Sequence, residues 1–164
     1  MDNAGALGIL AFLGMFMLVF VIIGIVAYVL MALGLYTMAK NRGIENPWLA
    51  WIPIANLYIL AKLIGTLSIG GWQVPNLEMF LPLATVVVVF TSWIPVLGFL
   101  ISIANVVLLA FALHKLYKMY RPEQATLWLI LTIVGFVTGI LAILGPIFLF
   151  IMRNDTPVNQ GEAA

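Results

Sequence analysis

The sequence predicts an all-α polytopic membrane protein with four transmembrane helices and a possible re-entrant segment broken by proline. Three observations predict this class. Of the 164 residues, 65% are hydrophobic and only 8% are charged, whereas about a quarter of the residues of soluble domains are charged. Long stretches almost lack acidic residues, and each reaches the ~20 residues that cross a hydrocarbon core; they are residues 4–38, 47–67, 79–113 and 125–152. We therefore expect one integral membrane domain over residues 1–153 and a short polar tail over 154–164.

The first stretch predicts a transmembrane helix that remains in the mature protein. No Lys or Arg precedes its apolar run, whereas a cleavable signal peptide normally begins with a basic region. The two basic loops that follow, residues 39–45 and 114–122, are expected in the cytoplasm because loops rich in Lys and Arg tend to stay there. The N-terminus is then outside, and the chain crosses the membrane an even number of times between the two loops.

The stretch 79–113 is too long for one straight crossing and is expected to bend at Pro95, because proline removes a backbone donor and clashes with the preceding turn. Two crossings result. Because the number of crossings between the two basic loops must be even, the segment 47–67 cannot cross as well and is expected to be a re-entrant hairpin broken at Pro53. In this hairpin Lys62 extends its ammonium group to the cytoplasmic interface. The alternative keeps 47–67 as a true span and makes 79–113 one tilted, kinked helix. Both interpretations contain four spans.

The last stretch, 125–152, predicts one spanning helix with a kink at Pro146. Arg153 and the tail would then lie outside. Gly135 and Gly139 form a G-x-x-x-G pair, a spacing that favours close packing between membrane helices, although short matches of this kind also occur by chance.

Two asparagines accompany the proline breaks and are candidate polar lining. Asn56 follows Pro53, and Asn105 follows Pro95. Non-helical backbone at membrane depth survives only where protein or a water cavity covers it, so these amides are expected to bond freed backbone groups or to bond across helices. Lys62 is either a functional cation or an interfacial lysine.

The cytoplasmic corners contain two pairs of opposite charge, Arg42 with Glu45 and Arg121 with Glu123. Each pair is expected either to brace its loop or to form a docking surface for a cytoplasmic partner. The sequence shows no nucleophile with a paired base and no metal-ligand spacing. It therefore predicts no enzyme, no cofactor and no nucleic-acid partner.

Several phrases resemble a group of small, uncharacterised bacterial polytopic membrane proteins. They are AKNRGIENPWLAWIPIANLYILAKLIG, the later WIPVLG with IAN, and PIFLFIMRN. The group is similar to a domain of unknown function that is sometimes attached to signal peptidase I. The resemblance covers about residues 30–153 and implies the cytoplasmic membrane of a bacterium, Gram-positive in type, without supplying an activity.

Two functions remain open at this stage. The first is an integral membrane accessory or assembly protein that binds a membrane-protein partner or a second copy of itself. The second is a small transporter or channel whose polar lining lies at the broken helices, because discontinuous helices line the sites of many transporters.

Overall fold

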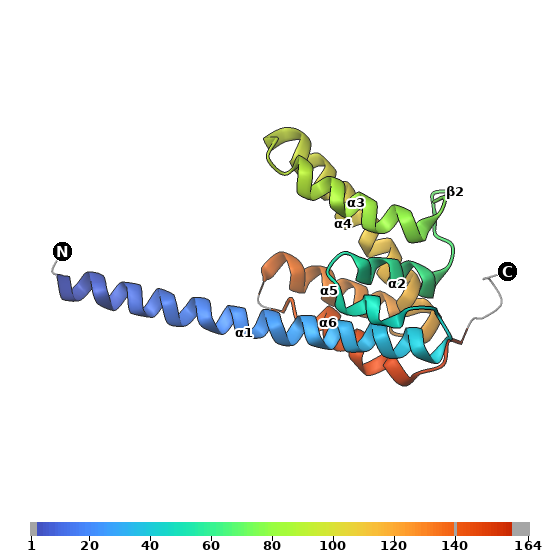
Figure 1. The fold of residues 1–164 in the computed structure, drawn as a ribbon, viewed down its shortest axis with the longest axis horizontal. Helices are drawn as coiled ribbons and strands as arrows, with labels where there is room; N and C mark the ends of the chain where they lie inside the picture. The colour runs from blue at the N-terminus through green and yellow to red at the C-terminus, as the bar shows by residue number, and fades with distance from the viewer. Residues whose placement is uncertain (1–2, 140, 159–164) are drawn as a thin grey trace.

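The computed structural model describes residues 3–139 and 141–158, which are helical apart from one short β-hairpin (Figure 1). The all-helical class predicted from the sequence is confirmed. Within the described residues, two helices, α1 and α4, are long and apolar enough to cross a membrane. The elements in chain order are α1 (Asn3–Asn41), η1 (Pro47–Trp51), α2 (Ala55–Ile64), β1 (Ser68–Ile69), β2 (Trp72–Gln73), α3 (Leu77–Thr91), α4 (Pro95–Tyr120), α5 (Ala125–Thr138), α6 (Leu144–Ile151) and η2 (Met152–Asn154).

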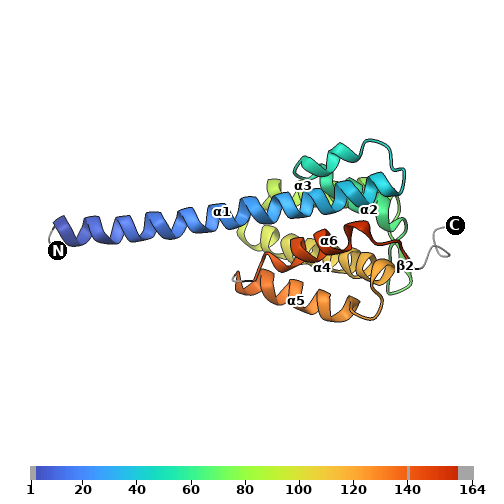
Figure 2. The same cartoon turned by 90° about the horizontal axis from the view of Figure 1, so that it is seen from below.

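Helix α1 is a long rod of 39 residues, about 58 Å at 1.5 Å per residue. Its second half packs against α6, η1 and α2. Its first half projects away from the rest of the molecule, as Figures 1 and 2 both show. The molecule is thus a helical body with one bare apolar arm.

The segment 47–67 folds back on itself at Pro53. The Tyr28 hydroxyl donates to the Trp51 carbonyl oxygen at 2.6 Å. Tyr28 lies 13 residues before Asn41, the last residue of α1, so η1 extends about 20 Å back along α1. Helix α2 then returns, and the Arg42 guanidinium donates to the Leu63 carbonyl oxygen at 2.5 Å. This is the geometry of the re-entrant alternative. The segment begins and ends near the same end of α1, so it is not one continuous helix.

Helices α3 and α4 form a hairpin whose turn lies immediately before Pro95. Helix α3 has 15 residues and α4 has 26, so their lengths are about 22 Å and 39 Å. Pro95 occupies the first turn of α4, where the missing N–H costs nothing because that donor is unpaired in any helix. The break predicted at this proline is present, and the single kinked helix is not.

The single span predicted over 125–152 is wrong, because the chain reverses between α5 and α6. The rings of Trp128 and Phe148 stack with centroids 4.5 Å apart, and Gly145 lies against Thr132. Helix α5 ends at Gly139, whose φ of 70° is left-handed, a conformation that glycine adopts without steric cost. Pro146 does not kink a helix; it lies in the first turn of α6, where proline is tolerated.

The hydrophobic core lies where these hairpins meet the second half of α1. Its most buried large side chains include Met38, Ile59, Leu63, Leu116 and Tyr117. Tyr117 packs edge-on against both stacked rings, with centroids 5.7 Å from Trp128 and 6.3 Å from Phe148. One core therefore joins α1, α2, α4, α5 and α6.

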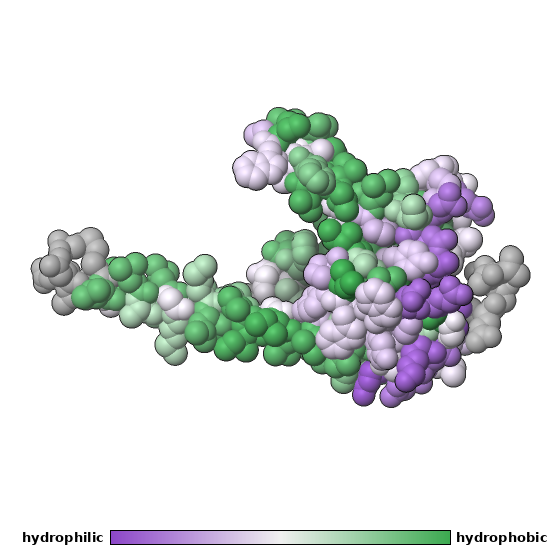
Figure 3. All heavy atoms as spheres, viewed as in Figure 1, coloured by the Kyte–Doolittle hydropathy of each residue, from purple (hydrophilic) through white to green (hydrophobic). Residues whose placement is uncertain are grey.

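Charged side chains gather at one end of the molecule, the end where α1 finishes, and Figure 3 shows them as a purple region there. Contacts along the chain bring them together: Asn41 donates to the Arg153 carbonyl oxygen at 3.2 Å, and Val158 N–H donates to the Met119 carbonyl oxygen at 2.7 Å. The start of the tail therefore lies beside the basic loops. This differs from the expectation that the tail lies away from the basic loops, because α6 runs back toward this end; residues 159–164 lie outside the described part. Basic residues occupy the last turns of α1, α2, α4 and η2: Lys40, Lys62, Lys118 and Arg153. The other three basic residues contact neighbouring segments: Arg42 at Leu63, Lys115 at Thr66 and Arg121 at Asp155.

Candidate functional site

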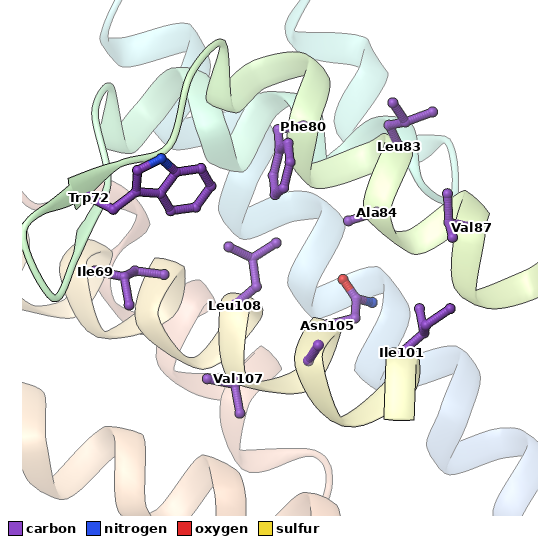
Figure 4. A pocket seen from close by; sticks show the side chains of 11 residues that line it. Ile69, Trp72, Phe80, Leu83, Ala84, Val87, Ile101, Asn105, Val107 and Leu108 are labelled. Atoms are coloured by element: carbon purple, nitrogen blue, oxygen red, sulfur yellow. The ribbon is translucent and has the colours of Figure 1, made fainter. Parts of the chain in front are cut away.

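An apolar groove of about 430 Å³ lies between α3 and α4, and two residues of the β-hairpin, Ile69 and Trp72, line one end of it (Figure 4). Ligand pockets in proteins span ~300–1,000 Å³ and are lined mostly by apolar groups with a few polar ones. Asn105 is the polar residue of this lining. The lining residues are Ile69, Trp72, Phe80, Leu83, Ala84, Val87, Ile101, Ala104, Asn105, Val107 and Leu108.

Asn105 bridges the two helices inside the groove. Its amide nitrogen donates to the Thr85 hydroxyl at 3.2 Å, and the Thr85 hydroxyl also donates to the Leu81 carbonyl oxygen at 3.3 Å. Asn105 itself is buried. A buried amide without a partner costs free energy, so this contact both satisfies Asn105 and holds α3 beside α4. The sequence-based prediction that Asn105 bonds across helices is confirmed.

The β-hairpin places Trp72 over the end of the groove. Ser68 pairs with Gln73 and Ile69 with Trp72, and the two-residue turn between them is Gly70–Gly71. Both glycines have positive φ, as a turn of this length requires. The Trp72 ring then meets Phe80 edge-on with centroids 6.3 Å apart, so the indole lines this end of the groove.

A second, more polar cavity of about 310 Å³ lies nearer the charged end, around Lys62 and Glu78. The Lys62 ammonium group forms an ion pair with the Glu78 carboxylate. The hydrogen bond to Glu78 is the largest cause that raises the pKa of Lys62 above its usual value. Lys62 is therefore positively charged at neutral pH, and it lies in the last turn of α2.

The structure does not bring the three predicted polar residues to one cavity. Asn105 lines the apolar groove and Lys62 lines the second cavity. Asn56 is buried in the first turn of α2 and lines neither of these two cavities. Within the described residues the Asn56 side chain forms no hydrogen bond, so its predicted bond to freed backbone is not present.

The predicted local charge pairs are replaced by longer-range contacts. Arg42 donates to the Leu63 carbonyl oxygen rather than to Glu45. Arg121 pairs with Asp155, with Nε 2.6 Å from Oδ2; this contact raises the pKa of Arg121. Glu45 and Glu123 are exposed. Both arginines therefore join distant segments, and the two glutamates remain on the surface of the charged end.

Lys115 is a further polar residue of interest that the sequence did not single out. Its ammonium group contacts the carbonyl oxygen of Thr66 and lies 3.3 Å from the Thr66 hydroxyl. Lys115 is seven residues after Leu108, two helical turns along the same face of α4 and about 10 Å nearer the charged end. The seven-residue spacing from Leu108 was the sequence feature that could have pointed to Lys115. It could be used only once Leu108 was known to line the groove.

No family model, curated protein or solved structure matches this chain. The resemblance drawn from its sequence phrases therefore stays a prediction. Within the described residues no group of three or more His, Asp or Glu side chains is placed to hold a metal ion. The geometry supports binding of apolar groups, with polar and charged contacts confined to one end.

Proposed function

We propose that this chain is a non-catalytic integral protein of the bacterial plasma membrane that acts as an accessory or assembly subunit. The observation that carries the proposal is the bare first half of α1. Sixteen large apolar side chains between Leu7 and Val26 are exposed. They surround the helix on all sides.

A helix that is apolar all round requires an apolar environment on all sides, either a protein core or a lipid bilayer. None of the most apolar 18-residue window of α1 is buried within the chain. Lipid supplies the missing environment, and the arm is long enough to cross a core of ~30 Å. The exposed apolar surfaces of α3 and α4 favour the same placement.

The charge distribution supports one orientation. Charged side chains gather at one end of the molecule (Figure 3), where α1, α2 and α4 end with Lys40, Lys62 and Lys118. Basic residues near membrane helices favour the cytoplasm. The charged end is therefore cytoplasmic, and the N-terminus is outside. The turn at 92–94 and the residues 139 and 141–143, none of which is charged, lie toward the other side or within the membrane.

The helix lengths favour three crossings with two re-entrant hairpins instead of four crossings. Helices α1, α3 and α4 cross, with α3 short and tilted beside α4. The hairpin of η1 and α2 enters from the cytoplasmic side and returns. The hairpin of α5 and α6 does the same, because 14 and 8 residues reach only about 21 Å and 12 Å.

The exposed apolar surface of the first half of α1 supports an accessory role, because another membrane protein can pack against it. The first half of α1 is not buried against the rest of the described chain. Phe12, Phe16 and Phe20 form a continuous aromatic stripe on one of its faces. Aromatic side chains provide large contact areas and favour stacked or edge-on partners. The proposal assigns this stripe to a partner helix in the bilayer and the opposite stripe, with Leu18 and Ile22, to lipid.

Site-specific photocross-linking tests the proposal. Benzoylphenylalanine replaces Phe16 or Phe20 in one set of cells, and Leu18 or Ile22 in the matched control set. We expect a protein adduct of one discrete mass from the aromatic stripe and none from the opposite stripe; an adduct of twice the chain mass identifies a second copy. Adducts from neither stripe, with a monodisperse monomer on blue-native electrophoresis, would contradict the accessory role.

A transporter is the second candidate, and the two cavities on either side of the β-hairpin favour it. Flux through proteoliposomes containing Lys62→Ala or Asn105→Leu protein separates the two functions. A transporter of this kind loses flux in at least one variant, whereas an accessory protein shows no flux above empty liposomes in any form.

A further inference from the structure

We infer that the groove between α3 and α4 binds one acyl chain of an anionic membrane lipid, with the lipid headgroup at Lys115. The inference rests on the proposed membrane insertion. The inference adds a specific ligand and its binding site to the proposed function.

The size of the groove indicates a ligand. Ligand pockets in proteins span ~300–1,000 Å³, and this open groove measures about 430 Å³. It extends from Phe80 to Val87 along α3 and from Ile101 to Leu108 along α4. Seven residues of helix correspond to about 10 Å, so the groove is elongated, as an acyl chain is.

The chemistry of the groove fits a hydrocarbon chain. Asn105 is the polar group within it, and its amide is already bonded to Thr85. A polar ligand placed there would lose its hydrogen bonds to water without replacement, which costs free energy. The rim residues Leu83 and Val107 are exposed, so the groove is open to the apolar surroundings of the helices, and a lipid chain can enter sideways.

The end of the groove nearest the charged end has the features of a headgroup site. Trp72 lines this end (Figure 4), and tryptophan is enriched at the level of lipid headgroups. Lys115 lies about 10 Å beyond Leu108 on the same face of α4. Lys62 is neutralised by Glu78, whereas Lys115 forms no ion pair within the described residues. The local charge is therefore positive, and it selects an anionic headgroup.

Native mass spectrometry of the full chain, released from detergent micelles, tests the inference. The probes are two single-chain lipids, lysophosphatidylglycerol, which is anionic, and lysophosphatidylcholine, which is zwitterionic. We expect one lipid per chain at saturation and about a fivefold preference for the anionic lipid, the effect of one cation near a headgroup. Lys115→Gln, whose amide can still donate to Thr66, should abolish the preference and retain binding of both lipids.

Two matched variants on neighbouring residues of α4 test the groove itself. Ala104→Phe fills the groove and should weaken binding of both lipids about tenfold. Ile103 is exposed and does not line the groove, so Ile103→Phe adds an aromatic ring to the same helix without effect on binding. Equal binding by the two variants would overturn the site.

The result for the wild-type chain separates this inference from the proposed function. Resistance of each protein to alkaline carbonate extraction reports membrane insertion. Lipid adducts that rise with lipid concentration without saturating, from a protein that resists extraction, would overturn the acyl-chain site and leave the membrane assignment intact. Extraction of the wild-type chain would overturn the membrane assignment, and the site with it.

Discussion

Gly34 determines how closely α1 approaches α6. A Cβ at this position would lie 2.8 Å from the backbone carbon and oxygen of Leu149. Backbone atoms cannot move aside as a flexible side chain can, so the two helices would have to separate. Close approach of this kind is how membrane helices gain packing contacts without a hydrophobic driving force between them.

We predict that Gly34→Ala lowers the free energy of unfolding by about 1–3 kcal/mol, the usual cost of overpacking. Gly24→Ala is the matched control, because nothing lies within 4 Å of its added Cβ, and alanine favours a helix over glycine. Thermal unfolding of the purified protein in detergent measures both. Equal melting temperatures for the two variants would contradict the close contact.

Arg42 connects the loop after α1 to the C-terminal end of α2. Its guanidinium donates to the Leu63 carbonyl oxygen at 2.5 Å, one of the last carbonyls of the helix, which lack intrahelical partners. A cation at a helix C-terminus is also favoured by the helix dipole. This contact closes the hairpin formed by η1 and α2.

Arg42→Ala should destabilise the protein by about 1.5–3 kcal/mol, the range for hydrogen bonds that involve a charged group. Lys40→Ala removes an equal charge from the same loop, where Lys40 is exposed, and should change stability by less than about 0.5 kcal/mol. Limited proteolysis between α2 and β1, run beside thermal unfolding, locates the loss. Matching losses in both variants would mean that net charge, and not the contact, is responsible.

At the scale of elements, the reversal between α5 and α6 distinguishes this fold from a bundle of simple spans. A Cβ at Gly135 would lie 2.2 Å from the Leu141 carbonyl oxygen, so the returning chain passes directly over the last turn of α5. Gly135 and Gly139 are thus required within the chain. Their predicted role in packing against a separate helix is replaced by a role in the turn.

A disulfide tests the reversal directly, because the chain contains no native cysteine. A Cβ at Gly145 lies 3.8 Å from the Cβ of Thr132, and disulfides join Cβ atoms ~3.8 Å apart. Thr132→Cys with Gly145→Cys should therefore oxidise to a cross-link, measured by counting free thiols before and after reduction. In one continuous helix the two positions would be about 20 Å apart.

The control for this cross-link is Thr126→Cys with Gly145→Cys. Thr126 lies six residues earlier in α5, about 9 Å further along the helix, and this pair should remain reduced. Free thiols in the first double variant under oxidising conditions would refute the hairpin.

At the scale of the whole molecule, charge is segregated to one end and apolar surface covers the rest. Figure 3 shows this division, with the arm and the α3–α4 hairpin green and the opposite end purple. Such a division is costly in water, because the apolar surface would remain hydrated. A bilayer interface provides both environments at once.

Cysteine labelling tests the orientation of the whole chain with a membrane-impermeant maleimide. We expect Ser92→Cys, in the turn between α3 and α4, to react in intact cells. Gln73→Cys in β2 and Thr156→Cys at the charged end should react only after lysis. Labelling of Thr156→Cys in intact cells while Gln73→Cys stays protected would mean that the α5–α6 segment crosses the membrane.

Local features of the sequence correctly predicted the helical class and two of the breaks. Composition alone predicts apolar helices, and a proline acts on the residues immediately before it, so the breaks at Pro53 and Pro95 can be placed without knowledge of packing. The third break was not predicted, because Pro146 was expected only to kink one continuous helix over 125–152. Proline in a first turn starts a helix as readily as proline in an interior turn bends one. The left-handed backbone of Gly139 supplied the actual break.

The sequence by itself determined that the chain forms apolar helices, where proline interrupts two of them, and that its basic residues cluster at the ends of the apolar stretches. Only the tertiary structure decided that α6 returns beside α1, that Arg121 pairs with Asp155, and that α3 and α4 enclose a groove around Asn105. The physical reason is that helices apolar on every side have no polar stripe to show which face packs. Which helices pack together is decided by close contacts between residues distant in the sequence, such as Gly34 with Leu149. Local periodicity cannot predict such contacts.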